Sequence, residues 1–72
     1  MNILIEDAEK LEYLTSNNKW SKKPADGKNF GLAETALAAA KLETMGQFNI
    51  VGYLSSNDQL FNLDHGHGKS AA

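Results

Sequence analysis

One helical segment lies between two stretches that have the pattern of strands, and this arrangement limits the fold more than any other feature. Residues 32–45 are rich in alanine and contain neither glycine nor proline. Gly31 or Asn29 is placed to begin the helix, and Glu34 falls in its first turn, where a carboxylate interacts favourably with the helix dipole. Gly46 suits the left-handed residue that ends many helices. The sequence therefore predicts an α+β fold with a single helix.

Four segments have strand patterns, two before the helix and two after it. Residues 3–5 are an apolar run, and residues 11–15 resume an extended pattern after a polar turn. Residues 47–54 and 59–64 flank the four-residue loop 55–58, which is typical of a hairpin. The expected fold class is therefore a four-stranded antiparallel sheet of order ββαββ, with one alanine-rich helix packed on one face.

The second hairpin also suggests a register and a core. A regular ladder across its loop places Gly52 opposite Phe61, so that the missing side chain leaves room for the ring. Two residues further along, the same ladder places Ile50 opposite Leu63. The side chains that share this face, the matching face of the first hairpin and the inner helix face form the expected core: Ile3, Ile5, Leu11, Tyr13, Phe30, Ala33, Ala36, Leu37, Ala40, Phe48, Ile50, Phe61 and Leu63.

The length of 72 residues gives room for one domain with a small core, and the lack of cysteine excludes a disulfide or a thiolate metal site. Residues 1–64 are expected to form this single domain, and the glycine-interrupted residues 65–72 a flexible C-terminal tail. The longest apolar run, residues 36–40, is far shorter than a membrane span, and no basic leader follows Met1. We therefore expect a cytoplasmic protein that does not enter a membrane.

Apolar side chains lie on both faces of the predicted sheet and on two faces of the helix, more than one pair of layers can cover. Either the loop that carries Trp20 folds across the second sheet face, or a second subunit or another protein covers it; both remain open. The sequence thus predicts a non-catalytic interaction or regulatory module, a homo-oligomer or the partner of another protein. Its candidate interface residues are Leu4, Trp20, Val51, Tyr53 and Leu60 on the sheet side, and Ala38, Leu42 and Met45 on the outer stripe of the helix.

Catalytic chemistry has little support in the sequence. Nucleophilic catalysis lacks a cysteine and a Gly-x-Ser-x-Gly elbow, and the clustered carboxylates fall in a polar turn, so we expect no catalytic residue and no cofactor. The alternative function is metal binding by Asp64, His65 and His67, because two imidazoles two residues apart project to one side of an extended chain. Zinc sites use three or four protein ligands, so this set would need an unusual geometry or a second chain.

A third function, binding of single-stranded nucleic acid, would use Tyr13, Tyr53 and Trp20 as stacking platforms. The charge argues against it, since the net charge is −2 and the basic residues include no arginine. A cluster of lysines in residues 19–28 is more typical of a solvated loop.

The layout of Tyr13, Trp20, Phe30 and the alanine-rich helix resembles small uncharacterised bacterial and phage-type ββαβ proteins. In these proteins a tryptophan follows the second strand and a phenylalanine precedes the helix. The resemblance covers residues 11–53 and implies an architecture without any catalytic residue. The chain departs from that pattern by its additional strand 59–64 and by its histidine- and glycine-containing end.

Overall fold

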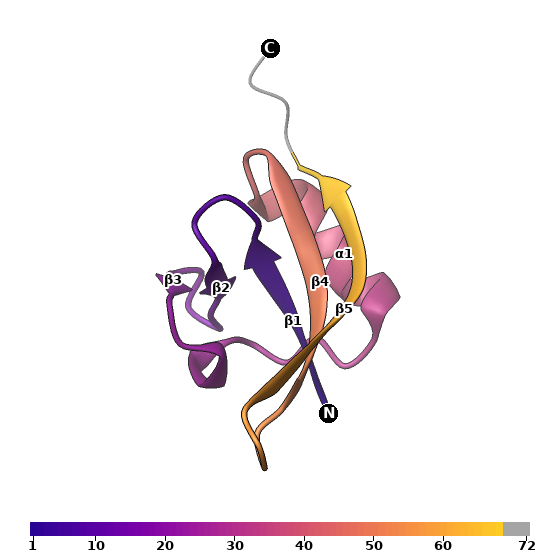
Figure 1. Ribbon diagram of the computed structural model, residues 1–72. Coiled ribbons are helices and arrows are strands. Elements are labelled where there is room, and N and C mark those ends of the chain that lie inside the picture. Colours follow the sequence, from indigo (N-terminus) through magenta and orange to yellow (C-terminus); the bar gives the residue numbers. More distant parts are fainter. Residues whose placement is uncertain (69–72) are drawn as a thin grey trace.

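The computed structural model describes residues 1–68 and contains one α-helix and a five-stranded antiparallel sheet of order β3-β2-β1-β4-β5 (Figure 1). This confirms the predicted α+β class with one helix. The elements in chain order are β1 (Asn2–Asp7), β2 (Glu12–Leu14), β3 (Trp20–Ser21), the 3-10 helix η1 (Pro24–Asp26), α1 (Ala33–Glu43), β4 (Gln47–Leu54) and β5 (Gln59–His67). None of the helices in residues 1–68 has the length and apolar character needed to span a membrane.

The prediction of four strands in the order ββαββ is wrong, because the chain forms a third strand before the helix. After a turn that is closed by the bond from the Thr15 amide to the Lys19 carbonyl, Trp20 and Ser21 return alongside β2. This strand is only two residues long and makes one edge of the sheet. The aromatic ring of Trp20 packs against the helix-side core, which holds the short strand in place.

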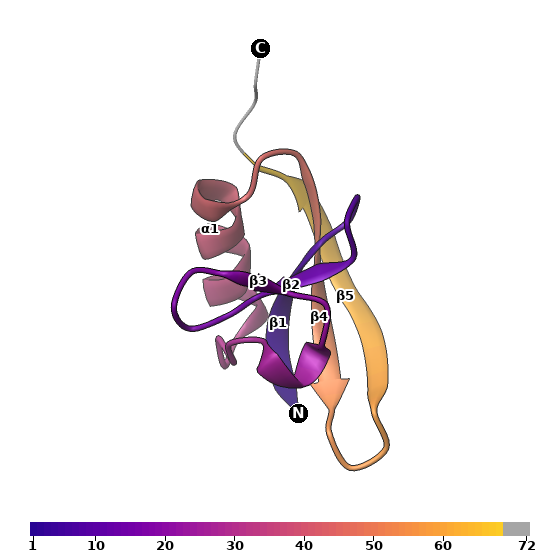
Figure 2. The ribbon, with the colours of Figure 1, turned by 90° about the vertical axis from the view of Figure 1, so that its left-hand side faces the viewer.

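Helix α1 lies on one face of the sheet, over β1, β4 and β5 (Figure 2). It begins later and ends earlier than residues 32–45, with Leu32 as the N-cap residue and Thr44 as the C-cap residue. The Thr44 hydroxyl donates a 2.8 Å hydrogen bond to the Ala40 carbonyl, which also accepts the Thr44 amide N–H at 3.0 Å. Asn29 does not cap the helix; its side-chain oxygen accepts the amide N–H groups of Ile3 and Gly31.

Two apolar clusters lie on opposite faces of the sheet. The larger one, under the helix, consists of Ile3, Ile5, Leu14, Ala36, Ala40, Phe48 and Ile50. The smaller one consists of Leu4, Tyr13, Val51 and Tyr53. The loop around η1 covers part of this second face, since a Cβ atom placed on Gly27 would lie 3.1 Å from the methyl groups of Leu4. The chain therefore covers much of its second face with its own loop.

Three predicted core residues lie at the surface: Leu11, Phe61 and Leu63 are 59%, 39% and 43% exposed. Leu11 falls in the tight turn after β1, with a φ of 54°. Tyr13 is buried, but in the second cluster. Leu63 is the extra residue of a bulge in β5 and has no partner on β4.

The β4–β5 hairpin follows the predicted register near its loop and departs from it further on. Gly52 is opposite Phe61 as expected, but its missing side chain makes room for Met1, whose sulfur would lie 2.5 Å from an added Cβ atom. Beyond Val51 the ladder contains a bulge, so that Ile50 pairs with Asp64 and Leu63 has no partner on β4. Strand β5 continues to His67, three residues past the predicted domain boundary at residue 64. Residues 69–72 of the expected tail lie outside the described part.

Candidate functional site

The segment from Asp64 to Gly68 forms an ordered part of the sheet, and its glycines explain the position of the bulge. Gly66 pairs with Phe48, and a Cβ atom at Gly66 would lie 2.6 Å from the end of that buried ring. Gly68 packs in the same way against Thr44 and donates its amide N–H to the Gly46 carbonyl at 2.6 Å. The bulge shifts the pairing of β5 by one residue, so that Gly66 and not His65 lies opposite Phe48. Only glycine leaves enough room there for the Phe48 ring.

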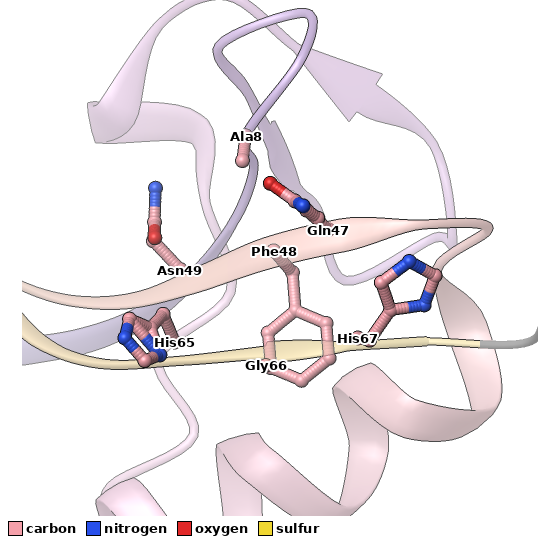
Figure 3. Close-up of a pocket in the computed structure, with 7 residues that line it drawn as sticks. All are labelled: Ala8, Gln47, Phe48, Asn49, His65, Gly66 and His67. Atoms are coloured by element: carbon pink, nitrogen blue, oxygen red, sulfur yellow. The ribbon is translucent and has the colours of Figure 1, made fainter.

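Gly66 faces the Phe48 ring on the helix side of the sheet. Because side chains alternate along a strand, its neighbours His65 and His67 project to the face opposite α1. His65 pairs with Asn49, and His67 pairs with Gln47. The four side chains and Ala8 surround a shallow hollow of about 530 Å³ (Figure 3). Its full lining is Ala8, Gln47, Phe48, Asn49, His65, Gly66 and His67. Apart from the histidines, the lining contains no titratable side chain among the described residues.

A buried carboxylate lies beside this hollow and organises the polar side chains around it. Glu6 is only 9% exposed, and its two oxygens accept hydrogen bonds from the Tyr13 hydroxyl at 2.8 Å and from the Asn49 amide at 2.9 Å. Tyr13, Glu6, Asn49 and His65 form one continuous cross-strand row over β2, β1, β4 and β5. Glu6 therefore fixes the orientation of Asn49 at the rim of the hollow.

Both tyrosines of the chain donate their hydroxyl groups to carboxylates. Burial, together with the hydrogen bond to Glu6, raises the pKa of Tyr13 to about 12. The Tyr53 hydroxyl donates to Asp58 at 2.7 Å, and this hydrogen bond raises the pKa of Tyr53. The two rings lie in the second apolar cluster, and Trp20 packs against the first. The three aromatic side chains proposed to stack on bases are thus occupied by packing within the chain.

The predicted metal ligands are not brought together as a set of three. Asp64 pairs with Ile50 on the helix side of β5, whereas His65 and His67 project to the other face. One Asp64 oxygen accepts the amide N–H of His65 at 2.8 Å. Among residues 1–68 no three His, Cys, Asp or Glu side chains are grouped closely enough to hold a metal ion. His65 and His67 share one face of the strand, without Asp64.

The predicted interface residues fall into a buried and an exposed group, with Trp20 half-buried between them. Leu4, Val51 and Tyr53 are buried in the second cluster, so the expectation that they form an open surface is wrong. Leu42 and Met45 are 65% and 69% exposed, and Ala38 is also exposed on the helix. The exposed part of the sheet is its outer strand β5, which carries Leu60.

The edge formed by β5 is the surface feature that the sequence pattern did not indicate. Within residues 1–68 this strand pairs with β4 alone, and eight of its nine residues are exposed. Leu60, Phe61 and Leu63 lie close together along it. The available signal was that residues 59–64 form the second strand of the last predicted hairpin. Such a strand is an edge strand unless another segment of the chain pairs with it.

Comparisons with known proteins found no match for this chain. No protein-family model matches it, and neither the curated proteins nor the solved structures contain a significant match. The function must therefore be inferred from the chain's own geometry.

Proposed function

We propose that this protein is a non-catalytic interaction module that self-associates by antiparallel pairing of β5 with the β5 strand of a second copy. The observation that carries this proposal is the nine-residue outer strand, which pairs on one side only among the described residues. Unpaired amide and carbonyl groups along such a strand are a template for another strand. The opposite edge is less suited, because β3 is only two residues long.

The side chains of β5 favour pairing with another strand, because most of them do not block association at a sheet edge. Edge strands of monomeric proteins commonly carry lysine or proline, which prevent association, and β5 has neither. Its exposed leucines and phenylalanine instead offer apolar contacts on both sides of an added strand. The bulge at Leu63 and the charge of Asp64 are the features of the strand that limit edge pairing.

A second copy fits this edge because two β5 strands can pair in antiparallel orientation without placing like charges opposite each other. The register that overlaps all nine residues places Leu63 on the two-fold axis, with Asn62 of each chain opposite Asp64 of the other. Two unlike polar side chains then face each other, and no like charges do. Figure 1 shows the start of α1 beyond the outer edge of β5, and Leu32 at that end is 66% exposed.

The test is the molar mass by light scattering or sedimentation from low to high micromolar concentration, for the parent and for two variants. Leu63→Lys places two ammonium groups at the two-fold axis and is expected to keep the protein monomeric. Leu42→Lys makes the same change on the outer helix stripe, at a leucine that is 65% exposed against 43% for Leu63, and is expected to leave association unchanged. Circular dichroism verifies that both variants fold.

A parent protein that stays monomeric at several hundred micromolar would refute the proposal. Dissociation by Leu42→Lys but not by Leu63→Lys would assign the interface to the helix stripe of Ala38, Leu42 and Met45 instead. Retention of the dimer in both variants would exclude the two surfaces together.

A further inference from the structure

We propose that His65 and His67 form a chelating site for a divalent transition-metal ion on the sheet face opposite α1. The site does not depend on self-association, because it is built within one chain. It uses two histidines without Asp64, which lies on the other side of the strand.

The first observation is that the fold fixes both imidazoles on one face. Residues two apart in a strand point the same way, and the packing of Gly66 against Phe48 and of Gly68 against Thr44 determines which way that is. A regular ladder without the bulge would turn the two histidines toward the helix. Because the bulge turns them toward the hollow, both rings border it, one on either side of Gly66 (Figure 3).

The second observation concerns the atoms around the rings. His67 Nδ1 lies 3.4 Å from the Gly68 carbonyl oxygen, and in the tautomer that carries its proton on Nδ1 the Nε2 lone pair is free to bind a metal ion. Gln47 and Asn49 stand opposite, and their amide oxygens can accept hydrogen bonds from metal-bound water. No lysine lines the hollow, and the Glu6 carboxylate lies next to Asn49, so the electrostatic environment favours a cation.

The ligand set also indicates the class of metal. Imidazole nitrogen binds copper, nickel and zinc, whereas magnesium and calcium prefer carboxylate and carbonyl oxygen. Two protein ligands leave the other coordination positions to water, which makes this an open site with labile exchange. The expected order of affinity is Cu²⁺ above Ni²⁺ and Zn²⁺, following the general stability series.

The chain allows a clean experiment because it has only these two histidines and no cysteine. Protein without a polyhistidine tag is titrated calorimetrically with NiCl2 and with MgCl2, for the parent and for His65→Ala and His67→Ala. We expect one nickel ion per chain in the parent, at least a tenfold loss of affinity in each variant, and no binding of magnesium. The expected loss is large because a chelate needs both rings.

A second measurement separates a site of the folded strand from binding to any His-x-His sequence. Nickel that binds the native state more tightly than the unfolded chain raises the melting temperature. We expect this rise in the parent and its loss in both variants. Nickel binding weaker than about 1 mM, single variants that bind like the parent, or binding without a rise in melting temperature would each overturn the proposal.

Discussion

The bulged register of β5 makes a sharp prediction for Gly66→Ala. The new methyl carbon would lie 2.6 Å from Cζ and 3.1 Å from Cε1 of Phe48, whose ring is fully buried under the helix. Neither the ring nor the strand can move without disturbing the core. Overpacking of this kind costs about 1–3 kcal/mol, and replacing glycine by alanine returns about 0.4–1 kcal/mol through the unfolded chain.

The net expectation is a loss of about 1–2 kcal/mol, which in a domain of this size lowers the melting temperature by roughly 5–15 °C. Gly52→Ala is the matched control, since Gly52 lies in the neighbouring strand β4 of the same sheet. Its methyl carbon would lie 2.5 Å from the sulfur of Met1, which is the end of a flexible side chain that is 63% exposed. Met1 can swing away, so this variant should be as stable as the parent or slightly more stable.

Urea unfolding followed by circular dichroism, with the slopes compared, measures both differences. A Gly66→Ala protein as stable as Gly52→Ala would mean that Gly66 does not lie beside Phe48. The bulge, and with it the placement of both histidines, would then be wrong.

Three further predictions concern the cross-strand pair Tyr13 and Glu6 and the turn that contains Leu11. Tyr13→Phe leaves one buried oxygen of Glu6 without its donor and should cost about 1–3 kcal/mol in urea unfolding; an unchanged midpoint would mean that water replaces the hydroxyl. Because the folded pKa of Tyr13 is raised from 10.0 to about 12, its contribution to stability should be complete below pH 10 and decline toward pH 12; Tyr13→Phe should show a smaller decline, which comes from Tyr53. Leu11→Asn should raise stability by about 0.5–1 kcal/mol, since Leu11 is exposed and left-handed; a decrease would reveal packing by its side chain.

Periodicity predicted the elements that are long enough to show it. The alanine-rich helix, the hairpin 47–54 and 59–64, and the register next to its loop were all predictable from the sequence. The strand β3 was not, because the two residues Trp20 and Ser21 are too few for any alternation. Burial of the second face was one of two alternatives, and the choice between them depended on how the loop around Gly27 packs on Leu4.

The bulge also separates the predicted metal ligands, because it places Asp64 on the other face of β5 from His65 and His67. A regular ladder would pair Leu63 with Ile50 and keep apolar side chains together, so the pattern of hydrophobicity favours it. The structure instead satisfies the close contact of Gly66 with Phe48 and leaves Leu63 exposed. The alternation His-Gly-His-Gly was the available signal, because glycines at every second position allow a strand to pass close to bulky neighbours.

Deletion of Leu63 distinguishes the two registers directly. In the bulged ladder, Asn62 remains opposite Val51 and Asp64 opposite Ile50 after the deletion, because the lost residue has no partner on β4. The strand becomes regular, and stability should stay within about 1 kcal/mol of the parent.

In the regular ladder, by contrast, Leu63 would be a core side chain, and its removal would bring Asp64 against Ile50 at a cost of about 2–5 kcal/mol. Urea unfolding measures the difference, and nuclear Overhauser contacts between Asn49 and His65 report whether the pairing persists. A protein that folds with these contacts intact shows that the bulge is not needed to hold the histidines on their face. A protein that loses several kcal/mol shows that Leu63 supports the core, in which case the strand edge proposed for self-association is also incorrectly described.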